Sequence, residues 1–273
     1  MTSPKALVKD CLPPLVSRWL QQIRGGGNRF EGSFPSWAEA CQHATGYDTD
    51  AILTRVLDAT LKVKRGEAVF ERDSVLFFEP EYAWPALTGL MWAAAQNNGN
   101  LNVLDFGGAL GSSYFQHRKL LGTLPELRWN VIEQKHYVEA GKKHVQDETL
   151  KFYESLEACL LDQQPNAVLL SGVLQYVDDP EAIVDVLVRA HPSTIILDRT
   201  IVNDSTITRH YVQHVPCTIY PASYACRSLS ERRLIEWFSP DYQLVSAFPS
   251  LDFPALGLID SMFKGFIFNK VGL

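Results

Sequence analysis

Three glycines and one acid, Asp105, lie close together in one short segment of the sequence, Leu101–Ser113. The apolar run that ends at Asp105 is followed by Gly107, Gly108 and Gly111, and then by residues compatible with a helix. Glycine lets a backbone turn sharply and approach a ligand closely, and the N–H groups that open a helix attract an anionic group. We therefore expect a ligand site at this strand–turn–helix junction, with Asp105 accepting hydrogen bonds from an amine or hydroxyl of the ligand.

Three interpretations of this turn imply different ligands. The dinucleotide fingerprint G-x-G-x-x-G would begin at Gly107, but Ala109 and Ser112 stand where its second and third glycines belong. A tight turn between a strand and a helix, without any ligand, would also use these glycines. The run Val-Leu-Asp-x-Gly-x-x-x-Gly instead resembles the first motif of class I S-adenosylmethionine-dependent methyltransferases, V-L-D-x-G-x-G-x-G, with Ala109 in place of the central glycine.

A second acid follows the next apolar run, Arg128–Ile132. Glu133 comes after Gly111 at about the 20-residue spacing at which a carboxylate binds a nucleotide ribose in doubly wound folds. A surface glutamate at a strand end is the alternative. Because Asp105 ends the previous strand in the same way, we favour the ribose role for Glu133 and assign Gln134 to the same cofactor site.

The segment Ala167–Pro180 resembles the fourth-strand region of the same methyltransferases, whose strand end and loop lie beside the cofactor and the acceptor. Under that resemblance Ser171 and Gln175 line the floor of the pocket. Together with Gly66–Val75 and Val212–Pro216, these segments resemble a narrower bacterial group that carries a V-L-D-F-G-G-x-L-G-S signature and is associated with surface-polysaccharide biosynthesis. The resemblance implies S-adenosyl-L-methionine as cofactor and a small-molecule or carbohydrate-linked acceptor.

Methyl transfer to a hydroxyl would need further residues. Arg72, in the charge cluster Glu71–Asp73, has the planar guanidinium that suits a carboxylate such as the methionyl group of the cofactor. A general base should lie near the accepting hydroxyl. The candidates are Asp198 and Arg199 at the end of the fifth predicted strand, where a salt-bridging strand end is the alternative, and His210, His214 and Tyr220 in the insertion. The two histidines are spaced i,i+4 and could share one helix face, but without a third ligand at clear spacing we expect no metal site.

From Leu101 onward, short apolar runs alternate with helical segments, which is typical of βαβ units and a parallel sheet. Two closing strands are expected at Tyr242–Phe248 and Gly265–Lys270. The sequence thus predicts an α/β fold, a doubly wound and mostly parallel seven-stranded sheet of the Rossmann-like methyltransferase type. The other strands are expected at Asn102–Phe106, Arg128–Ile132, Lys151–Tyr153, Ala167–Ser171 and Thr194–Asp198, with helices at Ser112–Leu121, Tyr137–Val145 and Pro180–Ala190.

The first part of the chain has a different pattern. Residues 1–98 are expected to form a helical N-terminal cap and substrate region, and residues 99–273 the cofactor-binding methyltransferase domain, with an insertion at 199–240. Within that insertion a helix is expected near Leu229–Phe238. The cap helices are expected at Leu15–Ile23, Ser36–Ala44, Thr49–Lys62 and Trp84–Gln96.

Composition narrows the classes of partner. The chain has 273 residues with 25 Lys and Arg against 31 Asp and Glu, a net charge of −6, and therefore lacks the basic excess usual in nucleic-acid binding. The apolar stretch Ala86–Ala95 is too short to cross a bilayer, so no transmembrane segment is expected. Five cysteines without a C-x-x-C pair indicate reduced thiols. We expect a cytoplasmic protein.

Two rival functions stay open on the sequence. An NAD(P)-dependent nucleotide-sugar oxidoreductase or epimerase would share the doubly wound fold, although the Tyr-x-x-x-Lys pair that such enzymes often use does not occur in the chain. A non-catalytic protein that binds the cofactor or a partner enzyme would explain Ala109 and the lack of an unambiguous base. Cofactor affinity without turnover would distinguish this second rival.

Overall fold

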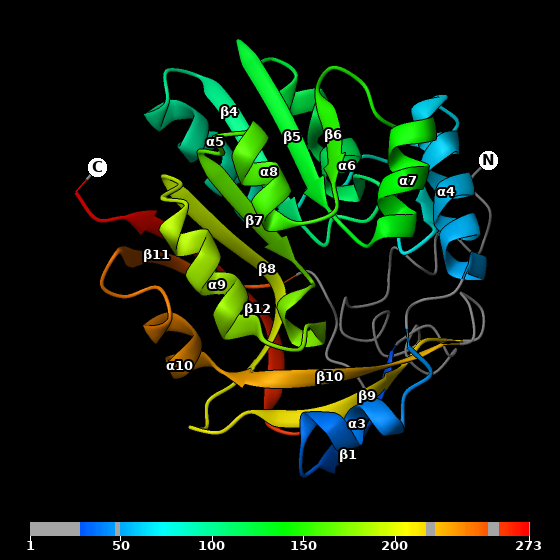
Figure 1. Ribbon diagram of the computed structural model, residues 1–273, viewed down its shortest axis with the longest axis vertical. Coiled ribbons are helices and arrows are strands. Elements are labelled where there is room, and N and C mark those ends of the chain that lie inside the picture. Colours follow the sequence, from blue (N-terminus) through cyan, green and yellow to red (C-terminus); the bar gives the residue numbers. More distant parts are fainter. Residues whose placement is uncertain (1–27, 47–49, 217–221, 251–256, 273) are drawn as a thin grey trace, which may run out of the picture.

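A computed structural model describes residues 28–46, 50–216, 222–250 and 257–272. Its main feature is a ten-stranded sheet with helices on both faces (Figure 1), and a two-stranded hairpin forms a second, separate sheet. No helix in the described ranges is long and apolar enough to cross a membrane.

Five parallel strands form the centre of the sheet. In spatial order they are β6 (Leu150–Tyr153), β5 (Glu126–Ile132), β4 (Asn100–Phe106), β7 (Ala167–Ser171) and β8 (Thr194–Asn203). β12 (Ser261–Lys270) pairs antiparallel with β8, and β11 (Tyr242–Pro249) pairs antiparallel with β12. These seven strands confirm the predicted doubly wound α/β class.

Alternate residues of the central strands face two different helical layers, as period-two side-chain alternation requires. On one face, Val103, Val131 and Leu169 pack against α4 (Asp50–Lys64), α5 (Trp84–Gln96), α6 (Ser112–Leu121) and α7 (Lys135–His144). On the other face, their neighbours Leu104, Ile132 and Leu170 pack against α8 (Leu156–Asp162), α9 (Pro180–Arg189) and α10 (Glu231–Glu236). The α8 helix has no counterpart among the predicted elements.

The insertion contains strands where the sequence predicted mainly a helix. The fifth predicted strand continues to Asn203 as β8, and β9 (Arg209–His214) and β10 (Ser223–Ser230) follow it. β10 pairs with both β9 and the end of β8. These strands form a ribbon across the carboxyl ends of the parallel strands (Figure 1), so they lie where a ligand of a doubly wound fold binds. The predicted helix Leu229–Phe238 begins only at Glu231.

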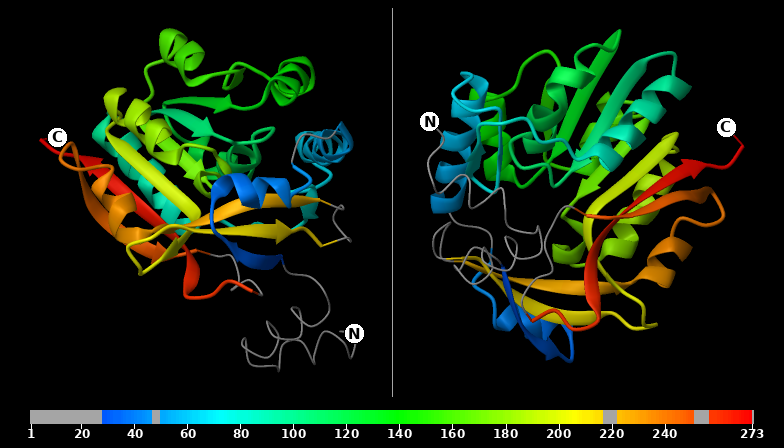
Figure 2. Two further views of the ribbon diagram at one scale, coloured as in Figure 1. Left: turned by 60° about the horizontal axis from the view of Figure 1, so that its bottom comes forward. Right: turned by 180° about the vertical axis from the view of Figure 1, so that it is seen from behind.

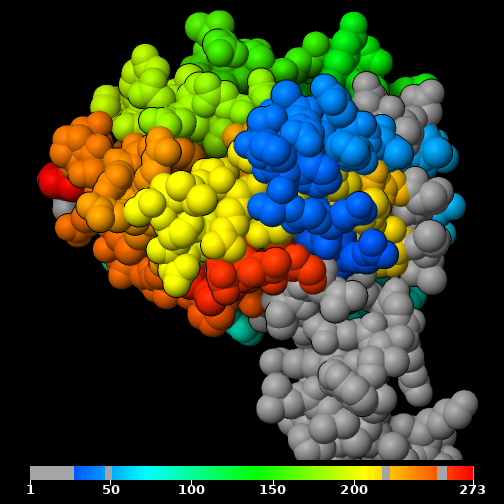
Figure 3. Space-filling model, turned by 90° about the horizontal axis from the view of Figure 1, so that it is seen from below, coloured from blue at the N-terminus to red at the C-terminus, as the bar shows by residue number. Residues whose placement is uncertain are grey.

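The N-terminal part supplies both helices and strands. α3 (Trp37–Gln42) packs on the β9–β10 ribbon, and β1 (Arg29–Phe34) pairs antiparallel with β9. Figures 2 and 3 show α3 on the outer side of that ribbon, and β1 extends the ribbon as a further strand. β2 (Phe70–Arg72) and β3 (Val75–Phe77) form the separate hairpin. The predicted helices over Ser36–Ala44, Thr49–Lys62 and Trp84–Gln96 are present as α3, α4 and α5, whereas Leu15–Ile23 lies outside the described residues.

Candidate functional site

The glycine-rich turn joins β4 to α6 through several residues in the left-handed region. Gly107, Ala109 and Gly111 have φ angles of 72°, 50° and 91°. A Cβ on Gly107 would lie 2.5 Å from Val173 Cγ2, and one on Gly108 would lie 2.4 Å from Asp105 Oδ2. Glycine is therefore required at these positions by close packing, and Ala109 holds a conformation that glycine would adopt more readily.

Asp105 supports this turn from inside the fold. Its side chain is 1% exposed, and its Oδ2 accepts a 2.9 Å hydrogen bond from the indole Nε1 of Trp129. Burial raises the pKa of Asp105 to about 7, against the opposing effect of the Trp129 hydrogen bond. The carboxyl thus faces Trp129 in the interior, and the contact expected from the sequence, with a ligand amine or hydroxyl, stays a prediction.

Glu133 ties the end of β5 to the same turn. Its Oε1 accepts from the backbone N–H of Ala109 at 3.3 Å, and its Oε2 accepts from the backbone N–H of Gln134 at 2.8 Å. Burial raises the pKa of Glu133, while these two hydrogen bonds lower it. Each carboxylate oxygen can accept a second hydrogen bond, so Glu133 retains the capacity to bind a diol. Gln134 is exposed at the start of α7.

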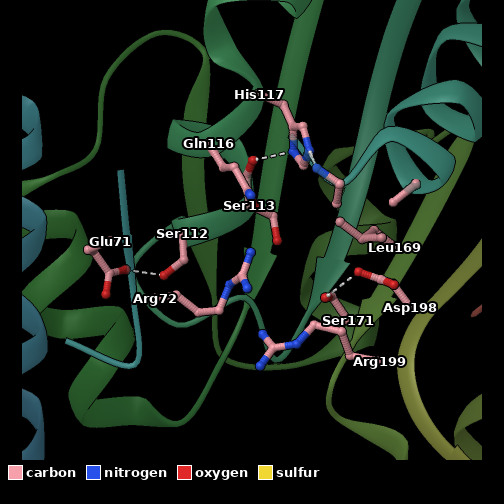
Figure 4. Close-up of a pocket in the computed structure, with 12 residues that line it drawn as sticks. Glu71, Arg72, Ser112, Ser113, Gln116, His117, Leu169, Ser171, Asp198 and Arg199 are labelled. Atoms are coloured by element: carbon pink, nitrogen blue, oxygen red, sulfur yellow. Dashed lines mark hydrogen bonds between the residues drawn. The ribbon is translucent and has the colours of Figure 1, made fainter. Parts of the chain in front are cut away.

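A small cavity lies between the hairpin, α6 and the ends of two parallel strands (Figure 4). Its volume is about 30 Å³, which is room for about two water molecules. The structure brings four of the residues named from the sequence together here, Arg72, Ser171, Asp198 and Arg199, whereas Tyr220 lies outside the described residues. The other lining residues are Glu71, Ala83, Ala86, Ser112, Ser113, Gln116, His117 and Leu169.

Asp198 and Arg199 lie at an irregularity in β8. The register between β8 and β12 shifts between Leu197 and Thr200, and Arg199 has a φ of 53°. Asp198 is 7% exposed, and the Ser171 hydroxyl donates to its Oδ2 at 3.5 Å. Gln175 fixes the other side of the irregularity, because its Nε2 donates to the Arg199 carbonyl at 3.0 Å.

The amide of Gln175 has one further property. The side chain is 1% exposed, and its Oε1 has no hydrogen-bond partner among the described residues. A buried acceptor without a donor is costly. Gln175 therefore has an oxygen that can accept one more hydrogen bond, but it is not among the lining residues of the cavity, and its place in a cofactor site stays a prediction.

Glu71 forms the hairpin wall of the cavity and was not selected from the sequence as a site residue. One oxygen accepts from the Ser112 hydroxyl, and the other accepts from the Ser74 N–H at 3.1 Å. Burial raises the pKa of Glu71 to about 7, although both hydrogen bonds lower it. Next to Glu71, the Arg72 guanidinium lies 5.8 Å from the ring centroids of both Phe70 and Phe77. The hairpin thereby holds Arg72 in the cavity wall.

His117 also lines the cavity without having been predicted. Its Nδ1 lies 2.8 Å from the Ser113 carbonyl, and its Nε2 accepts from the backbone N–H of Ala83 at 3.3 Å. Burial lowers the pKa of His117 to about 4, so the ring is neutral and both nitrogens are engaged. This arrangement joins α6 to the start of α5. Because the partner on α6 is the backbone carbonyl at position 113, which any residue type supplies, the sequence contained no specific signal for this role of His117.

His210 and His214 do not share a helix face, because both lie on β9. They share a side of that strand with Val212, which packs against Ala40 of α3. The ring of His210 is 6.4 Å from that of Trp37, and His214 Nε2 is 2.8 Å from Glu31 Oε2. Both histidines therefore face the outer side of the ribbon, away from the cavity that contains Asp198. In the described ranges no three His, Cys, Asp or Glu side chains form a group that could hold a metal ion.

No protein-family model matches the chain, and no curated protein matches it. Solved structures resemble it at low identity. A 1,6-didemethyltoxoflavin-N1-methyltransferase from Burkholderia thailandensis is 14% identical, with a TM-score of 0.45 over 88% of this chain and 92% of that one. An S-adenosylmethionine-dependent methyltransferase from Clostridium acetobutylicum is 7% identical, with a TM-score of 0.48 over 80% and 99%.

A third solved structure is CalS10, an amino pentose methyltransferase from Micromonospora echinaspora. It is 9% identical, with a TM-score of 0.45 over 79% of this chain and 97% of that one. At these identities and TM-scores the likenesses say nothing about the activity or the acceptor of this protein.

Proposed function

We propose that the protein is an S-adenosylmethionine-dependent methyltransferase that methylates a hydroxyl of a small or carbohydrate-linked acceptor in cell-surface polysaccharide biosynthesis. The observation that carries the proposal is the turn from Gly107 to Gly111, held at the carboxyl end of β4 by Glu133. In a doubly wound fold, ligands bind at this edge of the sheet. The resemblance of the turn to the first methyltransferase motif supports the choice of cofactor.

The residues around the turn suit the parts of that cofactor. Glu133 has lone pairs for the ribose hydroxyls, with exposed Gln134 beside it. Ser171 and the unpartnered Oε1 of Gln175 suit the methionyl ammonium, and Arg72 suits the methionyl carboxylate. The turn of Gly107, Gly108 and Gly111 would approach the cofactor closely, while the Asp105 carboxyl lies against Gly108 and accepts a hydrogen bond from Trp129. The cavity of about 30 Å³ must widen to admit a methionyl chain.

The chemistry of the acceptor side rests on Asp198. When bound, the cofactor supplies an electrophilic methyl group. Asp198 would accept the proton of the attacking hydroxyl, and the Ser171 hydroxyl would hold the carboxylate in place. The low exposure of Asp198 would exclude water from that proton transfer. We further propose that residues 1–98 and the insertion 199–240 shape the acceptor side of the site.

Calorimetric titration of the purified protein with S-adenosylhomocysteine, NAD and NADP tests the proposal. We expect micromolar binding of S-adenosylhomocysteine and no binding of either nicotinamide nucleotide. Binding of a nicotinamide nucleotide instead would point to the oxidoreductase class. If none of the three binds, the proposed cofactor is wrong.

A further inference from the structure

Two consecutive residues of β8 line the same cavity. Neighbouring side chains of a regular strand point to opposite faces, but Asp198 and Arg199 both line the space in Figure 4. The cause is the register shift at this point, where Arg199 adopts a φ of 53°. Left-handed backbone is unfavourable for arginine, and strain of this kind is concentrated at functional sites. The strained backbone therefore indicates a functional role for the Arg199 side chain.

The cavity contains a second guanidinium from a distant part of the chain. Arg72 enters it from the hairpin, and Figure 4 shows both guanidinium groups directed into the same region. Gln175 donates a hydrogen bond to the backbone carbonyl of Arg199. The Arg199 side chain is 24% exposed. Planar guanidinium groups match the geometry of carboxylates and phosphates. The wall that carries Arg199 is thus suited to an oxyanion.

A carboxylate of the protein already lies near this guanidinium. Asp73 is at the tip of the β2–β3 hairpin, and its Oδ2 lies 3.8 Å from Arg199 Nη2. The Asp73 side chain is 61% exposed, so the pair is solvated and its contribution is small. An incoming oxyanion with better geometry can displace it.

We propose that Arg199 binds an oxyanion of the methyl acceptor, a carboxylate or a phosphate, in competition with Asp73. The proposal rests on the proposed function for the identity of the ligand as acceptor. In this arrangement Arg72 binds the methionyl carboxylate of the cofactor and Arg199 binds the oxyanion of the acceptor, so the cavity must widen to admit both groups. Because Asp198 precedes Arg199, an acceptor anchored there has its neighbouring hydroxyl close to the proposed base. The acceptor class is therefore an acidic sugar, such as a uronic acid or a sugar phosphate.

The structure offers a matched control pair. Arg209 Nη1 lies 3.5 Å from Asp260 Oδ2, and the two side chains are 23% and 68% exposed. Asp260 has a φ of 48°, close to the 51° of Asp73. This pair resembles Arg199–Asp73 in the exposure of both side chains and in the backbone of the aspartate, although Arg209 lacks the positive φ of Arg199. Arg209 and Asp260 are not among the lining residues of the cavity. Substitutions here report the general effect of removing such an ion pair.

The experiment titrates glucuronate, glucose 1-phosphate and glucose into the full-length protein saturated with S-adenosylhomocysteine. The parent, Arg199→Gln, Arg199→Lys, Asp73→Asn, Arg209→Gln and Asp260→Asn are compared by calorimetry, after circular dichroism has verified folding. We expect at least one of the two anions, and not glucose, to bind the parent. Arg199→Gln should weaken that binding by about tenfold or more, and Arg199→Lys by less. Asp73→Asn should strengthen it up to about fivefold, and the Arg209 and Asp260 variants should match the parent.

The other outcomes are distinct. Failure of both anions to bind the parent, or parental affinity in Arg199→Gln, overturns the proposal. Loss of S-adenosylhomocysteine affinity in Arg199→Gln, with unchanged anion affinity, also overturns it by assigning Arg199 to the cofactor carboxylate. If S-adenosylhomocysteine does not bind the parent at all, the proposed function fails, and Arg199-dependent anion binding in the same samples still supports the oxyanion site.

Discussion

Asp198 owes its position to the backbone around it. The N–H of Gly172 donates to the Asp198 carbonyl at 2.9 Å, and the Ser171 hydroxyl lies 3.5 Å from its Oδ2. Both contacts come from the end of β7, the strand beside β8. A side chain held in this way by an adjacent strand is well placed for proton transfer, because little reorganisation is needed when the substrate binds.

Asp198→Asn is therefore expected to lower kcat by about 100-fold or more, because an amide cannot accept the hydroxyl proton. The affinity for S-adenosylhomocysteine should stay within about twofold of the parent. Radiometric methyl transfer to the acceptor that the parent methylates measures the first quantity, and calorimetry measures the second. His210→Ala is the control and should keep parental kcat, since His210 faces α3. A rate near the parental value in Asp198→Asn would assign the base to another residue.

Glu71 makes stability depend on pH. Burial raises the pKa of this carboxyl from 4.5 to about 7 in the folded protein. The folded state therefore binds the proton more tightly than the unfolded state. This tighter proton binding by Glu71 adds to the free energy of unfolding. The contribution is fully present below about pH 4.5 and is lost as the pH rises through about 7. Asp105 contributes in the same direction, because burial raises its pKa as well.

Glu71→Gln should reduce this loss of stability between about pH 5 and about pH 8, by up to about 3 kcal/mol in the free energy of unfolding. Urea denaturation at several pH values measures it. Glu67→Gln is the control, because a hydrogen bond from Arg65 lowers the pKa of that exposed carboxyl. An equal slope in the parent and in Glu71→Gln would mean that Glu71 does not titrate in this range.

The turn between β4 and α6 shows what a local pattern can predict. The order of an apolar run, glycines and a helix fixed the position of the turn and the start of α6 at Ser112. The same pattern did not reveal that Asp105 faces Trp129, because strand-end acids look alike in sequence whether they face solvent or the interior. That distinction depends on packing between β4 and β5.

Ala109→Gly should stabilise the protein by about 1 kcal/mol. A φ of 50° is unfavourable for alanine, whereas glycine adopts it freely. The greater freedom of glycine in the unfolded chain offsets part of this gain. Ala158→Gly is the control, and we expect it to lower the free energy of unfolding. Ala158 is exposed within α8, where glycine costs about 1 kcal/mol. Denaturant unfolding of both variants measures the difference, and a destabilised Ala109→Gly would show that the turn favours alanine for another reason.

The β9–β10 ribbon marks the limit of sequence-based prediction. The spacing of His210 and His214 fits a helix face, but the same two residues also lie on one side of a strand, since both are even-numbered. The ribbon is completed by β1, whose Arg29 pairs with His214 from the far end of the chain. Local patterns contain no signal for such a distant pairing, so neither the strands nor the outward direction of the histidines could be inferred.

At the scale of the whole molecule, the ribbon is attached to the parallel sheet above the candidate site. The Tyr176 hydroxyl, from the 3₁₀ turn Leu174–Tyr176 after β7, donates to Gln213 Oε1 of β9 at 2.5 Å. The rings of Tyr176 and Tyr224 pack edge to face, with centroids 6.3 Å apart. Gln213 lies on the side of β9 opposite to His210 and His214, so this contact connects the inner face of the ribbon to the strand end that carries Ser171.

Tyr176→Phe should loosen this attachment. Losing the hydrogen bond leaves the buried Gln213 oxygen without its donor, at a cost of about 1 kcal/mol. Tyr242→Phe removes a similar hydrogen bond, to the Pro192 carbonyl at 2.7 Å, at the far edge of the sheet. The two variants should therefore lose similar amounts of stability in urea. Only Tyr176→Phe should speed amide hydrogen exchange in β9 and β10, because of the two hydrogen bonds compared only the one from Tyr176 contacts the ribbon. Equal exchange in both variants would mean that strand pairing with β8 suffices to hold the ribbon over the site.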